Sequence, residues 1–149
     1  MKTKKILFPT DFSHTGDAAM AFAESLANDG NGKIIIVHVQ ESPLAYGTGE
    51  MYYGMLEPNI DQITEMLQNV RPSDSRTQFE HRLRMGDPAG EVVQLANDEG
   101  VDLIVLGSHG RTGLSRVLMG SVAEEIVRKA KCPVLVCKQP IEKLAAAAK

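Results

Sequence analysis

Alternation between short apolar runs and helical patterns is the feature that most restricts how this sequence can fold. Five runs read as strands, at residues 4–9, 33–39, 76–86, 101–107 and 132–138. Between successive runs, apolar residues recur three or four positions apart, which is typical of amphipathic helices. Such alternation predicts an α/β fold: one doubly wound, five-stranded parallel sheet with right-handed crossovers and helices on both faces.

The composition of the strands predicts their order in the sheet. The first, second and fourth runs are apolar throughout, as in central strands that are covered on both faces. The third run alternates apolar and charged residues, so it should form one edge, and the fifth run is left as the other edge. The predicted order is third-second-first-fourth-fifth. Chain order then reverses between the first and fourth strands, and ligands of such sheets bind beyond the carboxyl ends of the strands at that point.

Local signals mark the ends of the helices. Ser13 is the predicted N-cap of the first helix, and Gly30 and Gly32 are its predicted stop signals. Asp87 is the predicted cap of the third helix, which should end at Gly100. The apolar stripe of the first helix is expected to contain Ala19, Phe22, Ala23 and Leu26.

Two segments should meet in the crevice between the first and fourth strands. The fourth strand leads into a glycine-rich segment at 107–121, and no acidic residue occurs from 103 to 123 in a chain that has 19 of them. Glycines let backbone N–H groups approach a ligand closely, and the next helix offers unpaired N–H groups at its start. Arg111 and Arg116 could add charge-assisted bonds to phosphate. The first strand delivers Pro9, Thr10 and Asp11. A phosphorylated small molecule is the predicted ligand.

The glycine-rich segment also has a purely structural interpretation. Residues 121–124 read "SVAE", a capping box in which the Ser121 side chain caps its own helix. The glycines before it favour a ligand, because a plain strand-to-helix connection needs only two to six residues. Both roles can coexist if the hydroxyl exchanges its capping bond for a phosphate oxygen. The segment is not a P-loop, and no G-x-G-x-x-G follows the first strand.

Composition excludes several classes of protein. The formal net charge of −3 argues against nucleic-acid binding, and no apolar stretch approaches the length of a membrane span. Cys132 and Cys137 would point to opposite faces of one strand, so we expect free thiols and a cytoplasmic protein without membrane attachment. We expect residues 1–140 to form one domain and residues 141–149 to form a flexible C-terminal tail.

The sequence resembles the universal stress protein family, and specifically its ATP-binding branch, over about residues 2–138. The resemblance lies in "PTDFS" after the first strand, "VHV" at the end of the second and "GDP" before the third helix. It continues in "NDEGVDLIVLGSHGR" and in the signature G-x2-G-x9-G-[ST]. The four positions of that signature are Gly107, Gly110, Gly120 and Ser121.

The resemblance implies a role for each matching residue. Asp11, with the backbone of Pro9 and Thr10, would hold the nucleoside, and Val39 and Leu106 would line the adenine pocket. ATP, or AMP or ADP, would bind with Mg²⁺ or Mn²⁺ held by phosphates and water rather than by protein ligands. The ribose and phosphates would lie against Gly107, Gly110, Gly120, Ser121 and Val122.

One position departs from the family pattern. Some ATP-binding relatives carry a hydroxyl residue where this chain has Ala123. One phosphate contact is therefore missing, which leaves the preference among ATP, ADP and AMP open. Of the four histidines, His38 is expected to be a hydrogen-bonded, half-buried residue, and only His109 is a candidate phosphate donor.

The resemblance also implies a homodimer formed through the C-terminal strand at 133–137. An unpaired apolar edge is normally covered, and antiparallel pairing with a second copy would cover it. The loop at 41–58 has no clear period; it could pack at that interface or act as a lid.

The predicted function is that of an ATP-binding stress-response protein, a dimeric regulatory module with little or no turnover. The alternatives are a slow ATP hydrolase or phosphotransfer enzyme, a nucleotide-free dimeric scaffold, and a phosphoacceptor receiver domain. A receiver domain would need an aspartate at the end of the third strand, and only Asp11 is clearly placed for that chemistry.

Overall fold

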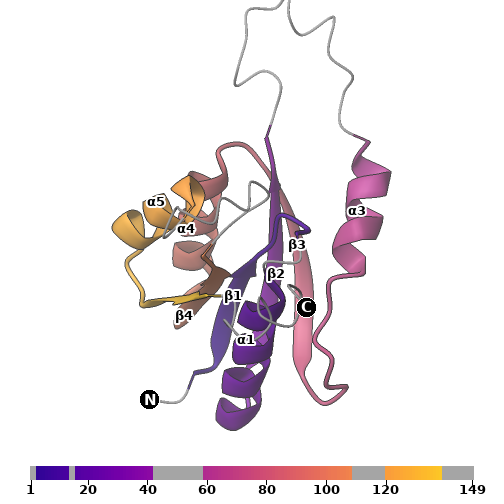
Figure 1. The fold of residues 1–149 in the computed structure, drawn as a ribbon, viewed down its shortest axis with the longest axis vertical. Helices are drawn as coiled ribbons and strands as arrows, with labels where there is room; N and C mark the ends of the chain where they lie inside the picture. Colours follow the sequence, from indigo (N-terminus) through magenta and orange to yellow (C-terminus); the bar gives the residue numbers. More distant parts are fainter. Residues whose placement is uncertain (1–2, 14–15, 42–58, 109–119, 139–149) are drawn as a thin grey trace, which may run out of the picture.

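The computed structural model describes residues 3–13, 16–41, 59–108 and 120–138 of the 149-residue chain. Strands and helices alternate within these ranges, as the sequence predicts (Figure 1). The strands are β1 (Lys5–Pro9), β2 (Lys33–Gln40), β3 (Gln78–Met85), β4 (Leu103–Gly107) and β5 (Val134–Cys137). The helices are α1 (Asp17–Gly30), α3 (Ile60–Gln68), α4 (Pro88–Glu99) and α5 (Ser121–Lys129).

The five strands form one parallel sheet in the order β3-β2-β1-β4-β5, which confirms the predicted topology and both predicted edges. Leu7 at the centre pairs with Ile35 of β2 on one side and with Ile104 of β4 on the other. β3 and β5 each pair with one described neighbour only. The carboxyl ends of β1 and β4 therefore lie side by side, which is where the switch-point rule places a ligand.

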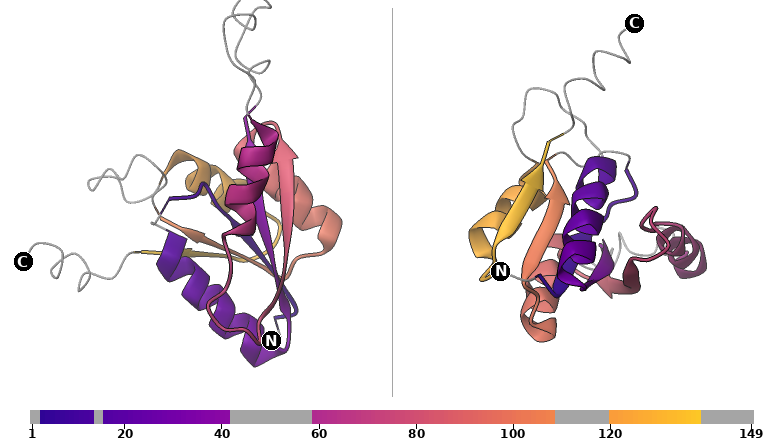
Figure 2. Two further views of the ribbon diagram at one scale, coloured as in Figure 1. Left: turned by 90° about the vertical axis from the view of Figure 1, so that its right-hand side faces the viewer. Right: turned by 90° about the horizontal axis from the view of Figure 1, so that it is seen from below.

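Helices cover both faces of the sheet, and each face has its own hydrophobic core (Figure 2). α4 and α5 cover the face that carries Leu7, Ile35 and Ile104. α1 and α3 cover the opposite face, which carries Ile6 and Ile34. Because successive side chains of a strand point to opposite faces, burial on both sides requires the unbroken apolar runs of β1, β2 and β4.

The predicted ends of α4 are confirmed, and the predicted start of α1 is wrong. The Asp87 carboxylate accepts the N–H of Gly90 at 2.8 Å, and Gly100 ends α4 in the left-handed conformation, with φ 62°. α1 begins at Asp17 with Gly16 as its N-cap, and no side chain caps it. Ser13 lies four residues before the first helical residue, and its N–H and hydroxyl donate to the Asp11 carboxylate.

The inward face of α1 is narrower than predicted. Ala19, Ala23 and Ala27 are fully buried against the sheet, whereas 55% of Phe22 is exposed. Small side chains let a helix approach a sheet closely, and that close approach leaves a large ring no space beneath the helix. The predicted stripe is therefore correct for its alanines and wrong for Phe22.

Gly30 is required for packing rather than for a turn. The left-handed residue that ends α1 is Asn31, with φ 53°, while a Cβ on Gly30 would lie 2.4 Å from the Thr3 carbonyl oxygen. Gly32 is restricted in the same way, since its Cβ would lie 2.5 Å from the same atom. The glycines predicted as stop signals thus let the segment before β1 pass directly over the end of α1.

We expect Gly30→Ala to destabilise the fold by about 2 kcal/mol, because a forced displacement of backbone costs about 1–3 kcal/mol. Alanine is also the better helix former, by about 1 kcal/mol, and this preference alone would stabilise the variant. The sign of the change in unfolding free energy therefore shows whether the backbone clash outweighs helix propensity. Urea denaturation measures the change in the free energy of unfolding.

The matched control is Gly100→Ala, where φ is 62° but no atom lies within 4 Å of the added Cβ. That control should lose only about 1–2 kcal/mol of stability, which is the cost of holding an L-residue in the left-handed conformation. Equal or improved stability of Gly30→Ala would contradict the packing explanation.

The two cysteines are free thiols, as predicted. Burial raises the pKa of both Cys132 and Cys137, which lowers the fraction of reactive thiolate at neutral pH. None of the helices in the described ranges combines the length and the apolar character needed to cross a bilayer. The predicted tail at 141–149 lies outside the described residues.

Candidate functional site

A cavity of about 440 Å³ opens at the carboxyl ends of β1, β2 and β4. It lies beyond the switch point and is bordered by the first turns of α4 and α5, as Pro88 and Ser121 both line it. Its size is in the range of small-molecule pockets, which are mostly apolar with a few converging polar groups. Its location matches the one derived from the strand order.

The structure brings together nine of the eleven residues predicted to bind a nucleotide. All nine line the cavity: Pro9, Thr10, Asp11, Val39, Leu106, Gly107, Gly120, Ser121 and Val122. The other two, Gly110 and Arg111, lie outside the described residues, as do Arg116 and His109. The segments that were expected to meet do meet, while the contacts of each residue with a ligand stay predictions.

The first turn of α5 forms one end of the cavity. Its N-cap is Gly120, whose extended backbone has φ −67° and ψ 159°, and whose N–H donates to the Ser108 carbonyl at 2.7 Å. Ser108 is buried, and its own N–H donates to the Cys137 carbonyl at the end of β5 at 3.0 Å. By helix geometry, the N–H groups of Ser121, Val122 and Ala123 have no acceptor within α5.

The predicted capping box at Ser121 is wrong. Ser121 is the first helical residue rather than the cap, and the cap residue, Gly120, has no side chain with which to cap α5. In a capping box the Glu124 N–H would donate to the Ser121 hydroxyl. Here it donates to the Gly120 carbonyl instead, as a regular helical hydrogen bond. Because the cap falls on a residue with no side chain, the positive end of the helix dipole borders the cavity directly. Such an end attracts anions.

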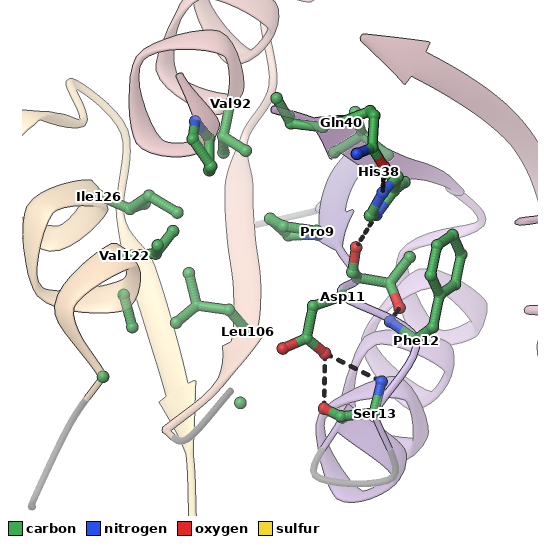
Figure 3. Close-up of a pocket in the computed structure, with 18 of the residues that line it drawn as sticks. Pro9, Asp11, Phe12, Ser13, His38, Gln40, Val92, Leu106, Val122 and Ile126 are labelled. Carbon is green, nitrogen blue, oxygen red and sulfur yellow. Dashed lines mark hydrogen bonds between the residues drawn. The ribbon is translucent and has the colours of Figure 1, made fainter. Parts of the chain in front are cut away.

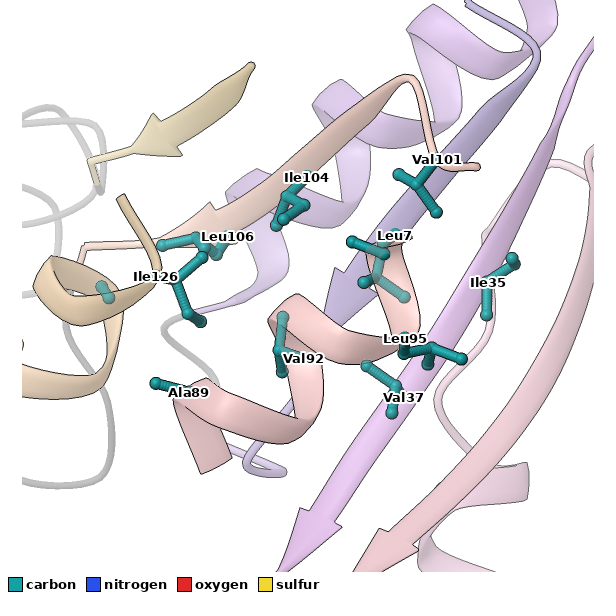
Figure 4. Packing of buried hydrophobic residues seen from close by; sticks show 12 residues of the cluster. Leu7, Ile35, Val37, Ala89, Val92, Leu95, Val101, Ile104, Leu106 and Ile126 are labelled. Carbon is teal, nitrogen blue, oxygen red and sulfur yellow. The ribbon is translucent and has the colours of Figure 1, made fainter. Parts of the chain in front are cut away.

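One half of the cavity is apolar. In Figure 3, Leu106, Val92, Val122 and Ile126 face the space next to Pro9. Val92, Leu106 and Ile126 also belong to the core between the sheet and α4 and α5 (Figure 4). Val92 and Ile126 lie on the apolar stripes of α4 and α5 that pack on the core. Nothing in a stripe distinguishes a residue beneath the cavity from one buried under a helix, so these two wall residues were missed.

The other half of the cavity is polar and is built from the turn after β1. The Asp11 carboxylate accepts the N–H and the hydroxyl of Ser13 at 2.9 and 2.5 Å. The Thr10 hydroxyl accepts the N–H of Phe12 at 3.0 Å. Phe12 has φ 70°, a left-handed conformation that costs a bulky L-residue about 1–2 kcal/mol. Two overlapping side-chain turns therefore hold one strained residue at the cavity wall.

His38 supports this turn from β2. It is only 8% exposed, and its Nδ1 lies 2.8 Å from the Thr10 carbonyl oxygen. Since a carbonyl can only accept, Nδ1 carries the proton. Nε2 lies 3.3 Å from the Gln40 side-chain oxygen, and the ring stacks on Phe12 with centroids 4.2 Å apart. The prediction of a hydrogen-bonded histidine is confirmed, but the side chain is buried rather than half-buried, and its contact with the turn was not foreseen.

The described part of the chain contains no metal site built from protein side chains alone. Within those ranges, no group of three His, Cys, Asp or Glu side chains could hold one. Asp11 and Glu41 are the carboxylates that line the cavity. A divalent cation in this cavity would therefore be held mostly by a ligand's phosphates and by water, which is usual for Mg²⁺.

These features match a known family of proteins. The model of the universal stress protein family matches residues 2–138, and the chain belongs to this family. That membership favours a universal stress protein over a receiver domain. The structure agrees, because β3 ends at Met85 and the nearby Asp87 is occupied in capping α4.

Relatives in the family resemble this chain over most of its length. The universal stress protein MJ0577 of Methanocaldococcus jannaschii is 30% identical over 154 residues, which cover 91% of this chain and 95% of that protein. The solved structure of MJ0577 has a TM-score of 0.72 at 31% identity, covering 94% of this chain and 99% of that one. UspA from Lactobacillus plantarum also has a TM-score of 0.72, at 26% identity, covering 91% and 98% of the two chains.

A third solved structure is a universal stress protein in complex with cAMP. It has a TM-score of 0.68 at 24% identity and covers 93% of this chain and 98% of its own. At that identity the likeness shows the fold alone.

Proposed function

We propose that this chain is an adenine-nucleotide-binding regulatory protein of the stress response, with ATP as its principal ligand. One observation carries the proposal: the start of α5, the Asp11 turn and an apolar wall all border the same cavity. An adenine nucleotide has the matching chemistry, since an apolar base, a hydroxylated sugar and a negative phosphate chain follow one another.

Each part of the nucleotide has a counterpart in the cavity. Leu106, Val39 and the core residues beneath them offer an apolar surface to the base. Asp11 is an acceptor suited to ribose hydroxyls, and the α5 amides suit phosphate oxygens. The complex of a family member with cAMP bears on the fold alone. The assignment of adenine therefore rests on the shape and chemistry of the cavity.

A divalent cation would accompany a triphosphate. The residues that line the cavity fit a cation held by phosphates and water, with Mg²⁺ or Mn²⁺ as the candidates. Bound there, the cation would neutralise charge on the phosphates. The chain's own residues would bind and orient the nucleotide, and the carboxylates that line the cavity lie at Asp11 and Glu41 rather than on α5. We therefore infer a binding role with little or no turnover.

The same proposal includes a homodimer through β5. This strand pairs with β4 on one side, and its Val134, Leu135 and Val136 are only partly buried in the monomer. A second copy, paired antiparallel, would satisfy the backbone of that edge and cover its side chains. We further infer that residues 1–140 form one domain with a tail at 141–149, and that the free thiols fit a cytoplasmic location.

Ligand binding should be visible as stabilisation of the purified protein. At 100 times the dissociation constant, ATP with Mg²⁺ should stabilise the fold by about 2.7 kcal/mol, which differential scanning fluorimetry detects as a higher melting temperature. Isothermal titration calorimetry should give saturable binding. The same titrations with ADP and AMP measure how affinity depends on the number of phosphates, and a titration with GTP measures how it depends on the base.

Two outcomes would decide against the proposal. Binding of GTP as tight as that of ATP would contradict the assignment of adenine. Absence of binding to any nucleotide, with no nucleotide released from the denatured protein, would favour a nucleotide-free scaffold. EDTA should weaken ATP binding but leave AMP binding nearly unchanged, since AMP has no polyphosphate chain to hold the cation.

A further inference from the structure

We propose that His38 and Phe12 are positioning residues that hold the Asp11 carboxylate toward the cavity and so determine how strongly the protein prefers a ribose with free hydroxyls. The inference rests on the proposed function, because it concerns the sugar of a bound adenine nucleotide. Neither side chain needs to touch the ligand. Their effect is transmitted through Thr10 and through the backbone of the turn.

Thr10 is the residue through which His38 acts. Its N–H donates to the Val37 carbonyl at 2.8 Å, which continues the ladder between β1 and β2. Its hydroxyl accepts the N–H of Phe12 at 3.0 Å, and its carbonyl accepts Nδ1 of His38 at 2.8 Å. The N–H, the hydroxyl oxygen and the carbonyl of Thr10 are thus each hydrogen-bonded, so the peptide that precedes Asp11 has a fixed orientation.

Phe12 fixes the other side of Asp11. A left-handed aromatic residue persists only where its surroundings impose that conformation, and such residues concentrate at functional sites. Here the conformation is held by the stack on His38, with an interplanar angle of 30°, and by the bond to Thr10. In Figure 3 the Phe12 ring and the Asp11 carboxylate leave the backbone on opposite sides. The ring that packs on His38 therefore directs the carboxylate away from His38.

The direction of the carboxylate matters because it is an acceptor for donors on a sugar. Ser13 already supplies two donors to Oδ1 of Asp11, which keeps the carboxylate beside the turn. Ribose hydroxyls can donate to an ionised carboxylate, and such charge-assisted bonds are stronger than neutral ones. If the turn relaxes, Asp11 remains in the protein but loses its alignment, and only ligands with sugar hydroxyls should lose affinity.

The test compares two ligands in each variant. ATP and 2′,3′-dideoxy-ATP differ only in the sugar hydroxyls, so the ratio of their dissociation constants isolates the contact with the sugar. The wild-type protein should prefer ATP by about tenfold or more, which corresponds to one charge-assisted hydrogen bond. Calorimetry measures both constants, and circular dichroism with thermal melting verifies the fold of each variant.

The variants separate the hydrogen bond from the ring stack. His38→Phe keeps an aromatic ring but removes the donor to Thr10, whereas His38→Asn keeps a donor but removes the ring. We expect the ATP preference to fall at least threefold in His38→Phe and in Phe12→Leu. It should fall less in His38→Asn, approach one in Asp11→Ala, and stay near the wild-type value in Phe12→Tyr.

His81→Phe is the matched control. His81 also bonds a carbonyl, that of Val70, at 2.8 Å through Nε2, and it also contacts a phenylalanine ring, that of Phe79. It lies on β3 and does not line the cavity. His81→Phe should therefore leave the ratio unchanged even if it lowers stability.

The possible outcomes distinguish this inference from the proposed function. Equal loss of affinity for both ligands in His38→Phe, or no loss for either, would overturn the positioning role while ATP binding stands. If the wild-type protein binds neither ligand, the proposed function fails and the inference with it. Should His38→Phe not fold, the contrast between Phe12→Leu and Phe12→Tyr carries the same test.

Discussion

Replacing Gly120 with valine should weaken ATP binding by more than about 100-fold while the protein still folds. The N–H groups of Ser121, Val122 and Ala123 follow this residue and border the cavity. A branched side chain on the cap would obstruct the approach of phosphate to them. Loss of two charge-assisted hydrogen bonds, at about 1.5–3 kcal/mol each, accounts for a change of that size.

The backbone of Gly120 makes this substitution compatible with folding. Its φ of −67° and ψ of 159° lie in the extended region that β-branched residues readily occupy. Valine is a poor N-cap, so we expect the free energy of unfolding to fall by about 1 kcal/mol. Calorimetry with ATP and urea denaturation measure the two effects separately, and Gly120→Ala should give a smaller loss of affinity. Unchanged ATP affinity in Gly120→Val would show that phosphate does not bind at the start of α5.

Replacing Val136 with proline should convert the proposed dimer into monomers that remain folded. The bonds from Ile104 N–H to the Pro133 carbonyl and from Ser108 N–H to the Cys137 carbonyl show that odd-numbered residues of β5 face β4. Because backbone groups alternate along a strand, the N–H of Val136 points to the open edge. Proline removes that donor without breaking a bond to β4, and edge strands tolerate proline. A two-fold axis places this change in both copies, so two hydrogen bonds of the interface would be lost. The dimer dissociation constant should therefore rise by more than about 100-fold.

Analytical ultracentrifugation over a range of concentrations measures this change, and circular dichroism verifies the fold. Leu135→Pro is the matched control: its N–H faces β4, so that variant should lose stability instead. A charge at the same strand, as in Leu135→Glu, should yield monomers or insoluble protein, since Leu135 packs against the core beneath α1 as well as lying on the edge strand. A stable Val136→Pro dimer would place the interface elsewhere.

The strand order and the position of the cavity were predictable from the sequence because both depend on properties that residues keep in any context. A run such as Ile34–Val37 can be buried on both faces only in a central strand, while the charges of Glu80 and Arg82 require an exposed edge. The switch-point rule then places the cavity, and the lack of acidic residues from 103 to 123 is the basis for the proposed anionic ligand.

The details that failed depend on competition between neighbouring residues. "SVAE" fits a capping box at Ser121, but the helix begins one residue earlier because Gly120 adopts the extended cap conformation. Ser13 resembles an N-cap, but α1 begins only at Asp17, and Ser13 belongs instead to the turn in which it donates to Asp11. The left-handed Phe12 has no signal in the sequence at all, since aromatic residues rarely adopt that conformation. It becomes recognisable only when His38, 26 positions later, is seen stacked on its ring.

Ser108 connects the start of α5 to the end of the edge strand β5. Its carbonyl accepts from the cap of α5, and its N–H donates to the last residue of the edge strand. In the proposed complex, the dimer edge and the phosphate end of the cavity would be joined by this short link of main chain. Thermodynamic linkage makes such a connection reciprocal. If dimerisation changes the affinity for the ligand by some factor, the ligand changes the affinity of the dimer by the same factor. If the proposed dimer and nucleotide site are coupled through Ser108, a rise in nucleotide concentration alters the assembly state without any covalent signal.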